Sequence, residues 1–377
     1  MTMRLRVATI VVCLALSSCG PAERVVVVHA IDAVPQRLSD WGVLYTAGRR
    51  LELNNRVMPY DLNTPLFSDY ALKLRAVWVP DGTSATYRAD QEFDFPVGTI
   101  ISKTFHYEKA LGWSAGSRKV VAADRDATPA DDGSLSLDDY RLIETRLLVR
   151  YAEGWRALPY VWDDAQDDAY LEVAGDIQLL ELVSKAGSQE IAYVVPDANQ
   201  CAGCHTPNHS TRELRPVGPR AWQLNRSYDY ADGVANQLEY WQAREILEGV
   251  AAAVPAGVSW TEPGDATLEM RAKAYLDANC AHCHNPDGAA DTSALHLNID
   301  AAVDRHYGVC KTPVAVGRGS GDRPYDIYPG RPEESILLFR MQHSDPAIAM
   351  PELGRAAVHA EAVYLIHNWI AGMNGEC

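Results

Sequence analysis

The stretch that decides the fold of this chain is "NCAHCHNPDG" at residues 279–288, together with its counterpart "QCAGCHTPNH" at residues 200–209. Each stretch contains two cysteines separated by two residues and followed directly by a histidine. In a helical backbone the two cysteines lie about one turn apart, with the histidine beside the second. The pattern is compatible with a metal site, a disulfide or a covalently attached cofactor, and the compartment helps to decide between them.

The N-terminus predicts export. Residues 1–18 combine two arginines with an apolar run at 7–16, which is too short to span a bilayer and is typical of a signal peptide. The sequence "LSSC" at 16–19 resembles the lipobox of bacterial lipoproteins, in which the cysteine is acylated. The alternative is an ordinary signal peptide with a cysteine there by chance. We expect a periplasmic lipoprotein that is anchored through Cys19 alone to a membrane, with the outer membrane favoured.

The cysteine count supports this compartment, because an oxidising periplasm disfavours idle thiols. Of the eight cysteines, Cys13 leaves with the signal peptide and Cys19 carries the lipid. Cys310 and Cys377 have no other evident partner, so we expect a disulfide between them. The remaining four belong to the two motifs: Cys201, Cys204, Cys280 and Cys283.

Three alternatives to haem can be compared for these motifs. Zinc ribbons place two Cys-x-x-Cys pairs about 15–20 residues apart, whereas 75 residues separate Cys204 from Cys280. A thioredoxin-like redox pair requires a single motif beside a βαβ unit. A disulfide inside each motif gives no reason for the histidine that follows both.

Haem accounts for all the residues of both motifs. Two thiols one turn apart reach the two vinyl groups of a haem edge, and the following histidine lies under the iron. We therefore predict two covalently bound haem c groups, with His205 and His284 as proximal iron ligands. The predicted attachment residues are Cys201 and Cys204 for the first haem, and Cys280 and Cys283 for the second.

The sequence predicts a distal iron ligand for the second haem but leaves that of the first haem open. Helical periodicity is expected over 264–280 and 361–373, and between these segments Met350 precedes Pro351. Small cytochromes c have this arrangement, so we expect Met350 to be the distal ligand of the second haem. Strand-like residues precede the first motif, and its distal ligand stays open. The candidates are an open position, His209, Met270, His106, Met58 and His29.

The fold expected from these patterns is multidomain α+β. Short alternating segments, such as "RLIETRLLVRYAEGW" at 141–155 with a turn at Glu153-Gly154, predict strands. Residues 114–140 are polar and predict a surface excursion. A further helix is expected over 232–249, with Asp232 as its N-cap. We expect a β-sandwich-like domain at 19–195, a first haem segment at 196–262 and a mainly α-helical cytochrome c-like domain at 263–377.

The chain resembles a family of exported bacterial di-haem c-type cytochromes with a β-rich N-terminal region. The resemblance covers most of the chain after the signal peptide and includes "PYDLNTPLFSDYALKLR", "FDFPVGTIISKTF", "RLIETRLLVR", "NQCAGCH", "NCAHCHNPDG", "GVCKTPVAVGRGSG", "YDIYPGRPEESILLFRM" and "MPELGR". It implies haem attachment at both motifs and electron transfer as the activity, and it adds little about the substrate.

The charge narrows the range of partners. The formal net charge is −16, and it becomes −18 after loss of the signal peptide, which contains two arginines and no acid. Such a surface disfavours nucleic acid and favours a basic redox protein as partner. The acidic stretch at 161–176 is either a solvated edge or a docking patch.

We expect a periplasmic electron carrier without catalytic residues of its own. Two alternatives remain: a di-haem peroxidase-like oxidoreductase with an open first haem, and an electron-accepting partner of a periplasmic dehydrogenase.

Overall fold

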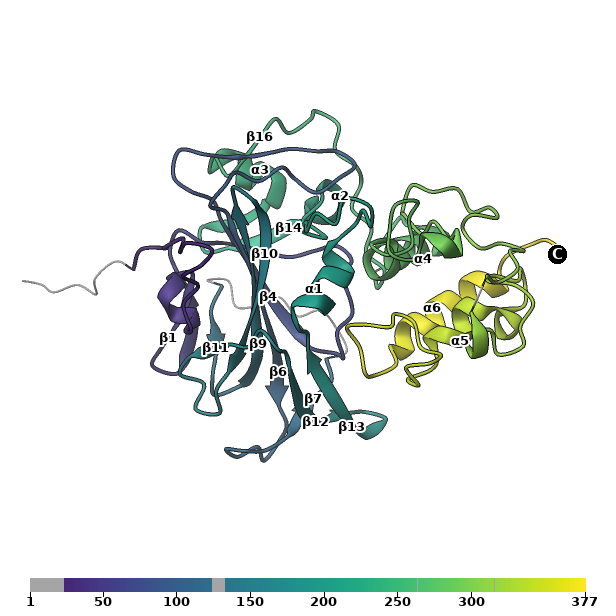
Figure 1. Cartoon of the computed structure of the whole chain (residues 1–377), viewed down its shortest axis with the longest axis horizontal. Coiled ribbons are helices and arrows are strands. Elements are labelled where there is room, and N and C mark those ends of the chain that lie inside the picture. The colour runs from purple at the N-terminus through teal and green to yellow at the C-terminus, as the bar shows by residue number, and fades with distance from the viewer. Residues whose placement is uncertain (1–23, 124–132, 263, 315) are drawn as a thin grey trace, which may run out of the picture.

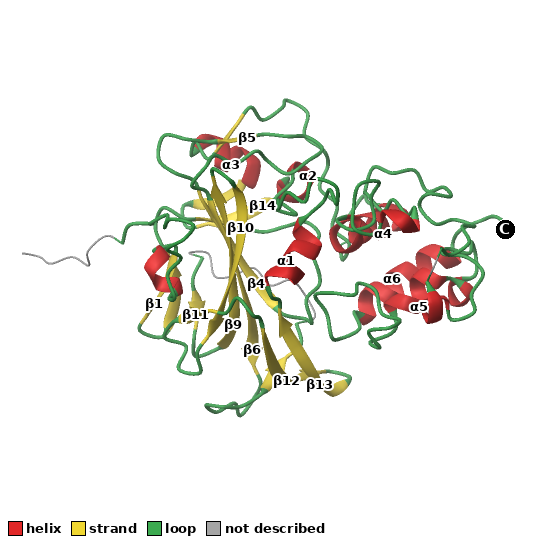
Figure 2. Cartoon of the chain, viewed as in Figure 1, coloured by secondary structure: helices red, strands yellow, loops and turns green. Residues whose placement is uncertain are grey.

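A curled half-barrel sheet organises the N-terminal half of the molecule, and helices gather in a C-terminal lobe beside it (Figures 1 and 2). The computed structural model describes residues 24–123, 133–262, 264–314 and 316–377. Cys13, Cys19 and the signal sequence lie outside the described residues. Among the described helices, none is long and apolar enough to cross a membrane.

The large sheet has nine strands within the described residues, in the order β11-β10-β9-β6-β7-β12-β13, with β4 beside β6 and β3 beside β4. All neighbours are antiparallel except β7 and β12. The strands are β3 (Met58–Tyr60), β4 (Leu72–Trp78), β6 (Ile100–Lys109), β7 (Lys119–Val121), β9 (Tyr140–Tyr151), β10 (Gly154–Trp162), β11 (Ala169–Leu171), β12 (Asp176–Ser184) and β13 (Gly187–Val195).

Three smaller sheets complete the β structure. They comprise β1 (Leu44–Ala47), β2 (Arg50–Leu53) and β8 (Leu135–Ser136); the hairpin of β14 (Ser227–Tyr230) and β15 (Gly233–Asn236); and the parallel pair β5 (Ala85–Thr86) and β16 (Leu247–Glu248). The polar excursion predicted at 114–140 is therefore partly wrong, because β7 and β8 within it join two of the sheets.

The hairpin predicted around Glu153-Gly154 is confirmed, but its turn lies one residue earlier than expected. Ala152 and Glu153 connect β9 to β10, and Gly154, with a φ of 136°, pairs with Tyr151 as the first residue of β10. A bulge opposite Phe105 and His106 leaves Ile143 without a partner on β6. Ile143 therefore packs with Phe105 on one face, while Leu147 packs on the other. Strict alternation along 141–155 would instead put Ile143 and Leu147 on the same face.

The β region is mixed with helices as expected, but it is one curled sheet and not two facing sheets. Its first face packs against Trp41 in a 3-10 turn (Leu38–Trp41) and against Leu51 in β2. Its second face is covered by the first haem segment, whose Leu238 and Trp241 share a core with Phe93 and Phe95. Because these elements cover both faces, the sheet needs no second sheet to bury its apolar residues.

Residues 196–262 contain three short helices: α1 (Ala198–His205), α2 (Ala221–Leu224) and α3 (Gln237–Ala243). The helix predicted over 232–249 begins five residues later than expected. Asp232 is not its N-cap, because Ala231 and Asp232 form the turn of the β14–β15 hairpin and Gly233 begins β15 opposite Tyr230. Asn236 caps α3 instead, and its side chain accepts a hydrogen bond from the Leu238 N–H.

The C-terminal lobe is built from α4 (Leu268–Leu276), α5 (Ile336–Met341) and α6 (Ala360–Ala371). The first and last of these confirm the helices predicted over 264–280 and 361–373, although α4 begins only after its N-cap Thr267. A π-helical turn (Asp277–Ala281) continues α4 into the second motif. Short 3-10 turns lie at Asp291–Ser293, Gly317–Ser320 and Pro332–Glu334. The core of the lobe includes Ala272, Leu276, Leu365, Ile366 and Trp369.

The disulfide predicted between Cys310 and Cys377 is confirmed, and the two Cα atoms lie 5.3 Å apart. It joins the extreme C-terminus to the long loop that connects the second motif to α5. Because 67 residues separate the two cysteines, the bond closes more than half of the C-terminal lobe into one loop.

Candidate functional site

A cavity of about 290 Å³ lies where the sheet, α1 and the C-terminal lobe meet. Both motifs contribute to its lining, although they are far apart in the sequence. The first motif contributes Cys201, Cys204 and His205, and the second contributes Cys280 and His282. The volume is close to the lower end of the usual range for ligand pockets.

Helix α1 positions the first motif directly after β13. Asp197 starts the helix with a capping box: its carboxylate accepts a hydrogen bond from the Gln200 N–H at 2.8 Å, and the Gln200 side chain accepts one from the Asp197 N–H at 3.0 Å. The helix therefore holds Cys201 and Cys204 one turn apart, with His205 at its last position. The prediction that a strand, and not a long helix, precedes this motif is confirmed.

The π-helical turn positions the second motif. The N–H groups of Cys283 and His284 both donate to the Cys280 carbonyl, at 3.1 and 2.9 Å. The backbone therefore turns at Cys280, and Cys283 follows three residues later, as Cys204 follows Cys201. Cys283 and His284 lie just outside the lining of the cavity, while Cys280 lies within it.

Both motif histidines have one ring nitrogen engaged. His205 Nδ1 lies 2.8 Å from the carbonyl oxygen of Arg215, so Nδ1 carries the proton and donates. His284 Nδ1 lies 3.1 Å from Ser293 Oγ, whose own proton goes to the Ala290 carbonyl at 2.6 Å. In both histidines Nε2 therefore keeps its lone pair, which is the tautomer that ligates a metal.

Burial sets the protonation of the motif side chains. It lowers the pKa of both His205 and His284 to about 4, so both rings are neutral at pH 7. It raises the pKa of Cys201 to about 11 and those of Cys280 and Cys283 to about 12. All four motif cysteines are free thiols, so neither motif forms an internal disulfide. Neutral imidazoles and free thiols at this spacing fit a covalent haem.

The two motifs are in direct contact, which the sequence did not predict. The Cys283 Sγ lies 3.5 Å from the Gly203 carbonyl oxygen, and the His209 N–H donates to the Asp287 carbonyl at 2.7 Å. The Leu353 side chain packs close to Gly203, since a Cβ there would lie 3.0 Å from it. The first motif therefore touches both the second motif and the loop that follows Met350.

The loop at 350–355 is tightly held at the edge of the cavity. The Met350 N–H donates to the Arg340 carbonyl at 3.1 Å, and Arg355 Nη2 donates to the Met350 carbonyl at 2.7 Å. From the β lobe, Asp69 Oδ1 accepts hydrogen bonds from the N–H groups of Ala356 and Ala357, both at 2.7 Å. The structure therefore brings Met350 to the cavity that Cys280 lines, as a distal ligand requires.

Met341 lines the same cavity but differs from Met350 in its packing. It is 6% exposed and belongs to the hydrophobic core of the C-terminal lobe. Met350 is half-buried and lies outside that core.

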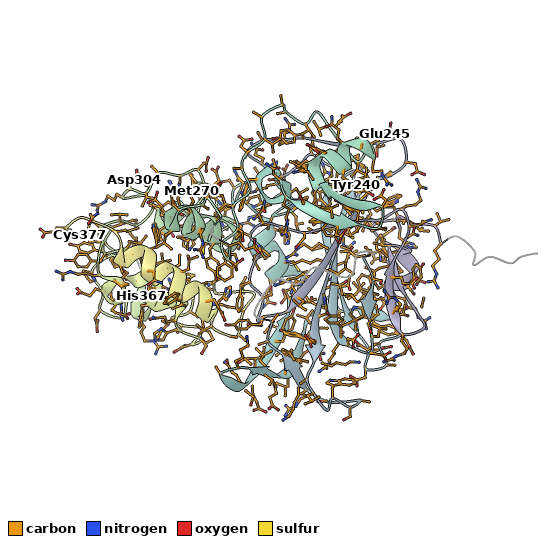
Figure 3. All side chains as sticks on the ribbon, turned by 180° about the vertical axis from the view of Figure 1, so that it is seen from behind. Tyr240, Glu245, Met270, Asp304, His367 and Cys377 are labelled. Atoms are coloured by element: carbon orange, nitrogen blue, oxygen red, sulfur yellow. A yellow bond between two sulfur atoms is a disulfide. The ribbon has the colours of Figure 1, made fainter. Side chains whose placement is uncertain are left out.

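None of the five side chains predicted as distal ligands of the first haem lines the cavity. His209 and Met270 are exposed, the latter by 42% on α4 (Figure 3). His106 packs edge-on against Tyr140, and Met58 lies against the core that contains Trp241. His29 bonds to the Asp40 carbonyl.

The cavity contains ligating and charged side chains that the sequence analysis missed. His282, the second spacer residue of the second motif, is 8% exposed, and its Nδ1 has no hydrogen-bond partner among the described residues. His359 reaches the cavity from the N-cap of α6. Lys103 and Arg146 reach it from the sheet. The alternation of residues along β6 and β9 could have shown that these two basic side chains share one face of the sheet. It could not have shown that this face lines the cavity.

The described residues contain no group of three or more His, Cys, Asp or Glu side chains that could hold a single metal ion. The geometry therefore gives no support to the zinc-ribbon alternative. Comparisons with protein-family models, curated proteins and solved structures find no match to this chain.

Proposed function

We propose that this chain is a di-haem c-type cytochrome that transfers electrons between redox proteins. The observation that carries the proposal is that two Cys-x-x-Cys-His motifs, separated by 75 residues, contact each other at one cavity. Each haem would supply an iron that takes up and releases single electrons. The chain's own residues attach the group, orient it and limit its contact with water.

The first haem would be held by Cys201 and Cys204, with His205 Nε2 toward the iron. The second would be held by Cys280 and Cys283, with His284 Nε2 as proximal ligand and Met350 as distal ligand. The hydrogen bonds from His205 to Arg215 and from His284 to Ser293 fix the two rings. The packing of α4 against α6 in the core of the C-terminal lobe supports a cytochrome c-like organisation of that lobe.

The setting proposed for this activity is the periplasm, with Cys19 as the lipid anchor. The net charge of −18 after processing favours a basic donor or acceptor, or a periplasmic dehydrogenase that delivers electrons to the chain. The confirmed disulfide agrees with an oxidising compartment.

One observation favours a second candidate, a peroxidase-like oxidoreductase. None of the five side chains predicted as distal ligands lines the cavity, so the first haem would have a free position for a small oxidant unless His282 occupies it.

Electron paramagnetic resonance of the oxidised holoprotein, combined with peroxide turnover, separates the two candidates. A carrier shows two low-spin irons, reversible one-electron titration of both haems and no turnover of hydrogen peroxide. A high-spin signal from one haem with sustained peroxide reduction would replace the carrier by the peroxidase. If the purified chain contained no haem, both candidate functions would be excluded.

A further inference from the structure

Three basic side chains form a row across the sheet and face the cavity. In the strand register Arg75 of β4 lies opposite Lys103 of β6, and Lys103 lies opposite Arg146 of β9. All three line the cavity. Like charges placed directly opposite each other on neighbouring strands repel, so such a row requires compensation.

Two members of the row have carboxylates of their own. Arg75 Nη1 lies 2.9 Å from Asp61 Oδ1, and both side chains are buried. Arg146 binds Glu144 through two nitrogens, at 2.8 and 2.5 Å, and Glu144 also accepts a hydrogen bond from the Tyr193 hydroxyl at 2.6 Å. These two guanidinium groups are therefore compensated within the sheet.

Lys103 is not compensated in this way. Among the described residues, no carboxylate lies within ion-pair distance of its ammonium group. Its Nζ lies 4.8 Å from the centre of the Phe105 ring, and the Arg146 guanidinium lies over the same ring at 4.3 Å. The two cations are therefore neighbours at the cavity wall. Burial, with the charges of Arg75 and Arg146, lowers the pKa of Lys103 well below its usual range. An anion beside Lys103 would offset both causes and favour the charged ammonium form.

The row lies beside the first motif. Cys204, His205, Lys103 and Arg146 line the same cavity. Any anion that Lys103 binds would therefore lie close to a group held by this motif.

We propose that Lys103, assisted by Arg146, binds a carboxylate or a similar oxyanion in the cavity beside Cys204 and His205. Two sources of this anion are considered, and only the first of them, a haem propionate, rests on the proposed function. The anion is either a propionate of the first haem or a small free anion that enters the cavity. Both are bound by the same chemistry, a charge-assisted hydrogen bond to the lysine next to a paired arginine.

The test compares the reduction potentials of both haems in the holoprotein and in Lys103→Met, Lys103→Arg and Lys109→Met. Lys109 is the matched control, because it lies on the same strand and donates to the Leu137 carbonyl outside the cavity. Loss of a positive charge disfavours the reduced iron. The potential of the first haem should therefore fall in Lys103→Met, remain near the parent value in Lys103→Arg and not change in Lys109→Met.

Titration with inorganic phosphate and with acetate separates the two sources. For a free anion, the spectrum and potential of the first haem respond saturably in the parent, and Lys103→Met abolishes the response. For a propionate, neither anion has an effect, while Lys103→Met still lowers the potential. If both haems are present by intact mass, and Lys103→Met changes neither potential nor anion response, the inference is wrong while the proposed function stands. Absence of haem from the parent would instead show that the proposed function has failed.

Discussion

Met350 and Met341 both line the cavity, and only Met350 is proposed as a ligand of the second iron. Thioether ligation favours Fe(II) more than imidazole does. Met350→His should therefore keep a six-coordinate iron at a lower potential. Met350→Leu should abolish the weak near-infrared sulfur-to-iron band, while Met341→Leu, a nearly volume-conserving change in the core, should keep it. The opposite result for the two leucine variants would transfer the ligand role to Met341.

Because of His106, the stability of the fold should depend on pH. Burial lowers its pKa to about 3, against 6.5 in an unfolded chain, and the charges of Lys73 and Arg75 act in the same direction. Between these values the unfolded chain binds a proton that the folded chain does not, so the free energy of unfolding falls as the pH falls from about 6.5 to 3. At pH 5 the loss from this residue is about 2 kcal/mol, at about 1.4 kcal/mol per pH unit.

Denaturant unfolding at pH 7 and pH 5 checks the His106 assignment. The parent should lose more stability between these pH values than His106→Gln does, because glutamine does not titrate. The control is His367→Gln, which replaces a partly exposed histidine of α6 and should lose as much stability as the parent. Equal losses in the parent and His106→Gln would show that His106 does not titrate in this way.

At the scale of elements, the Arg355 side chain joins the loop at 350–355 to the backbone around it. Arg355 donates to the carbonyls of Met350, His343, Arg340 and Ala357, at distances from 2.7 to 3.2 Å. Because arginine offers several donors in a fixed planar group, a single-point donor cannot replace it.

Arg355→Met should loosen the loop without removing the proposed ligand. We expect a weaker near-infrared band and faster binding of added imidazole at the second haem, with haem content unchanged. Arg331→Met, which removes an exposed arginine, should leave both properties as in the parent. Parent-like imidazole kinetics in Arg355→Met would show that the loop is held by other contacts.

Elements with a strong local pattern were predictable from the sequence. The helices α4 and α6 follow from apolar residues at helical spacing, and the β9–β10 hairpin follows from alternation with a glycine turn. Helix α3 was misplaced because Asp232 lies in the two-residue turn of the β14–β15 hairpin, a position that competes with the capping role it could also have. The bulge at Ile143 was not predictable, since it depends on pairing with β6.

At the scale of the whole molecule, the contact between the motifs could not be predicted, because it depends on how two lobes dock. The segment at 61–70 makes much of this docking. The Phe67 N–H donates to Asn279 Oδ1 at 2.8 Å, and the Phe67 ring stacks on His359 at 4.0 Å. Nothing in a sequence pattern pairs residues about 200 positions apart. For the same reason the row of Lys103 and Arg146 could be placed on one face, but not next to His205.

The disulfide gives a prediction at this scale. In the chain-entropy model, a bond closing a loop of 67 residues contributes about 4 kcal/mol, less any strain. The double variant Cys310→Ser with Cys377→Ser should therefore unfold at a markedly lower denaturant concentration, with both haems still attached. An unchanged unfolding midpoint would show that the packing of α4 and α6 alone determines the stability of the lobe.

Covalent attachment of haem at both motifs can be measured as the intact mass of the denatured protein. The parent should exceed its processed polypeptide mass by two haem groups, after allowance for the lipid. Replacing both cysteines of either motif by alanine, at 201 and 204 or at 280 and 283, should remove one haem and leave the other. A parent mass equal to that of the lipidated polypeptide alone would contradict the account.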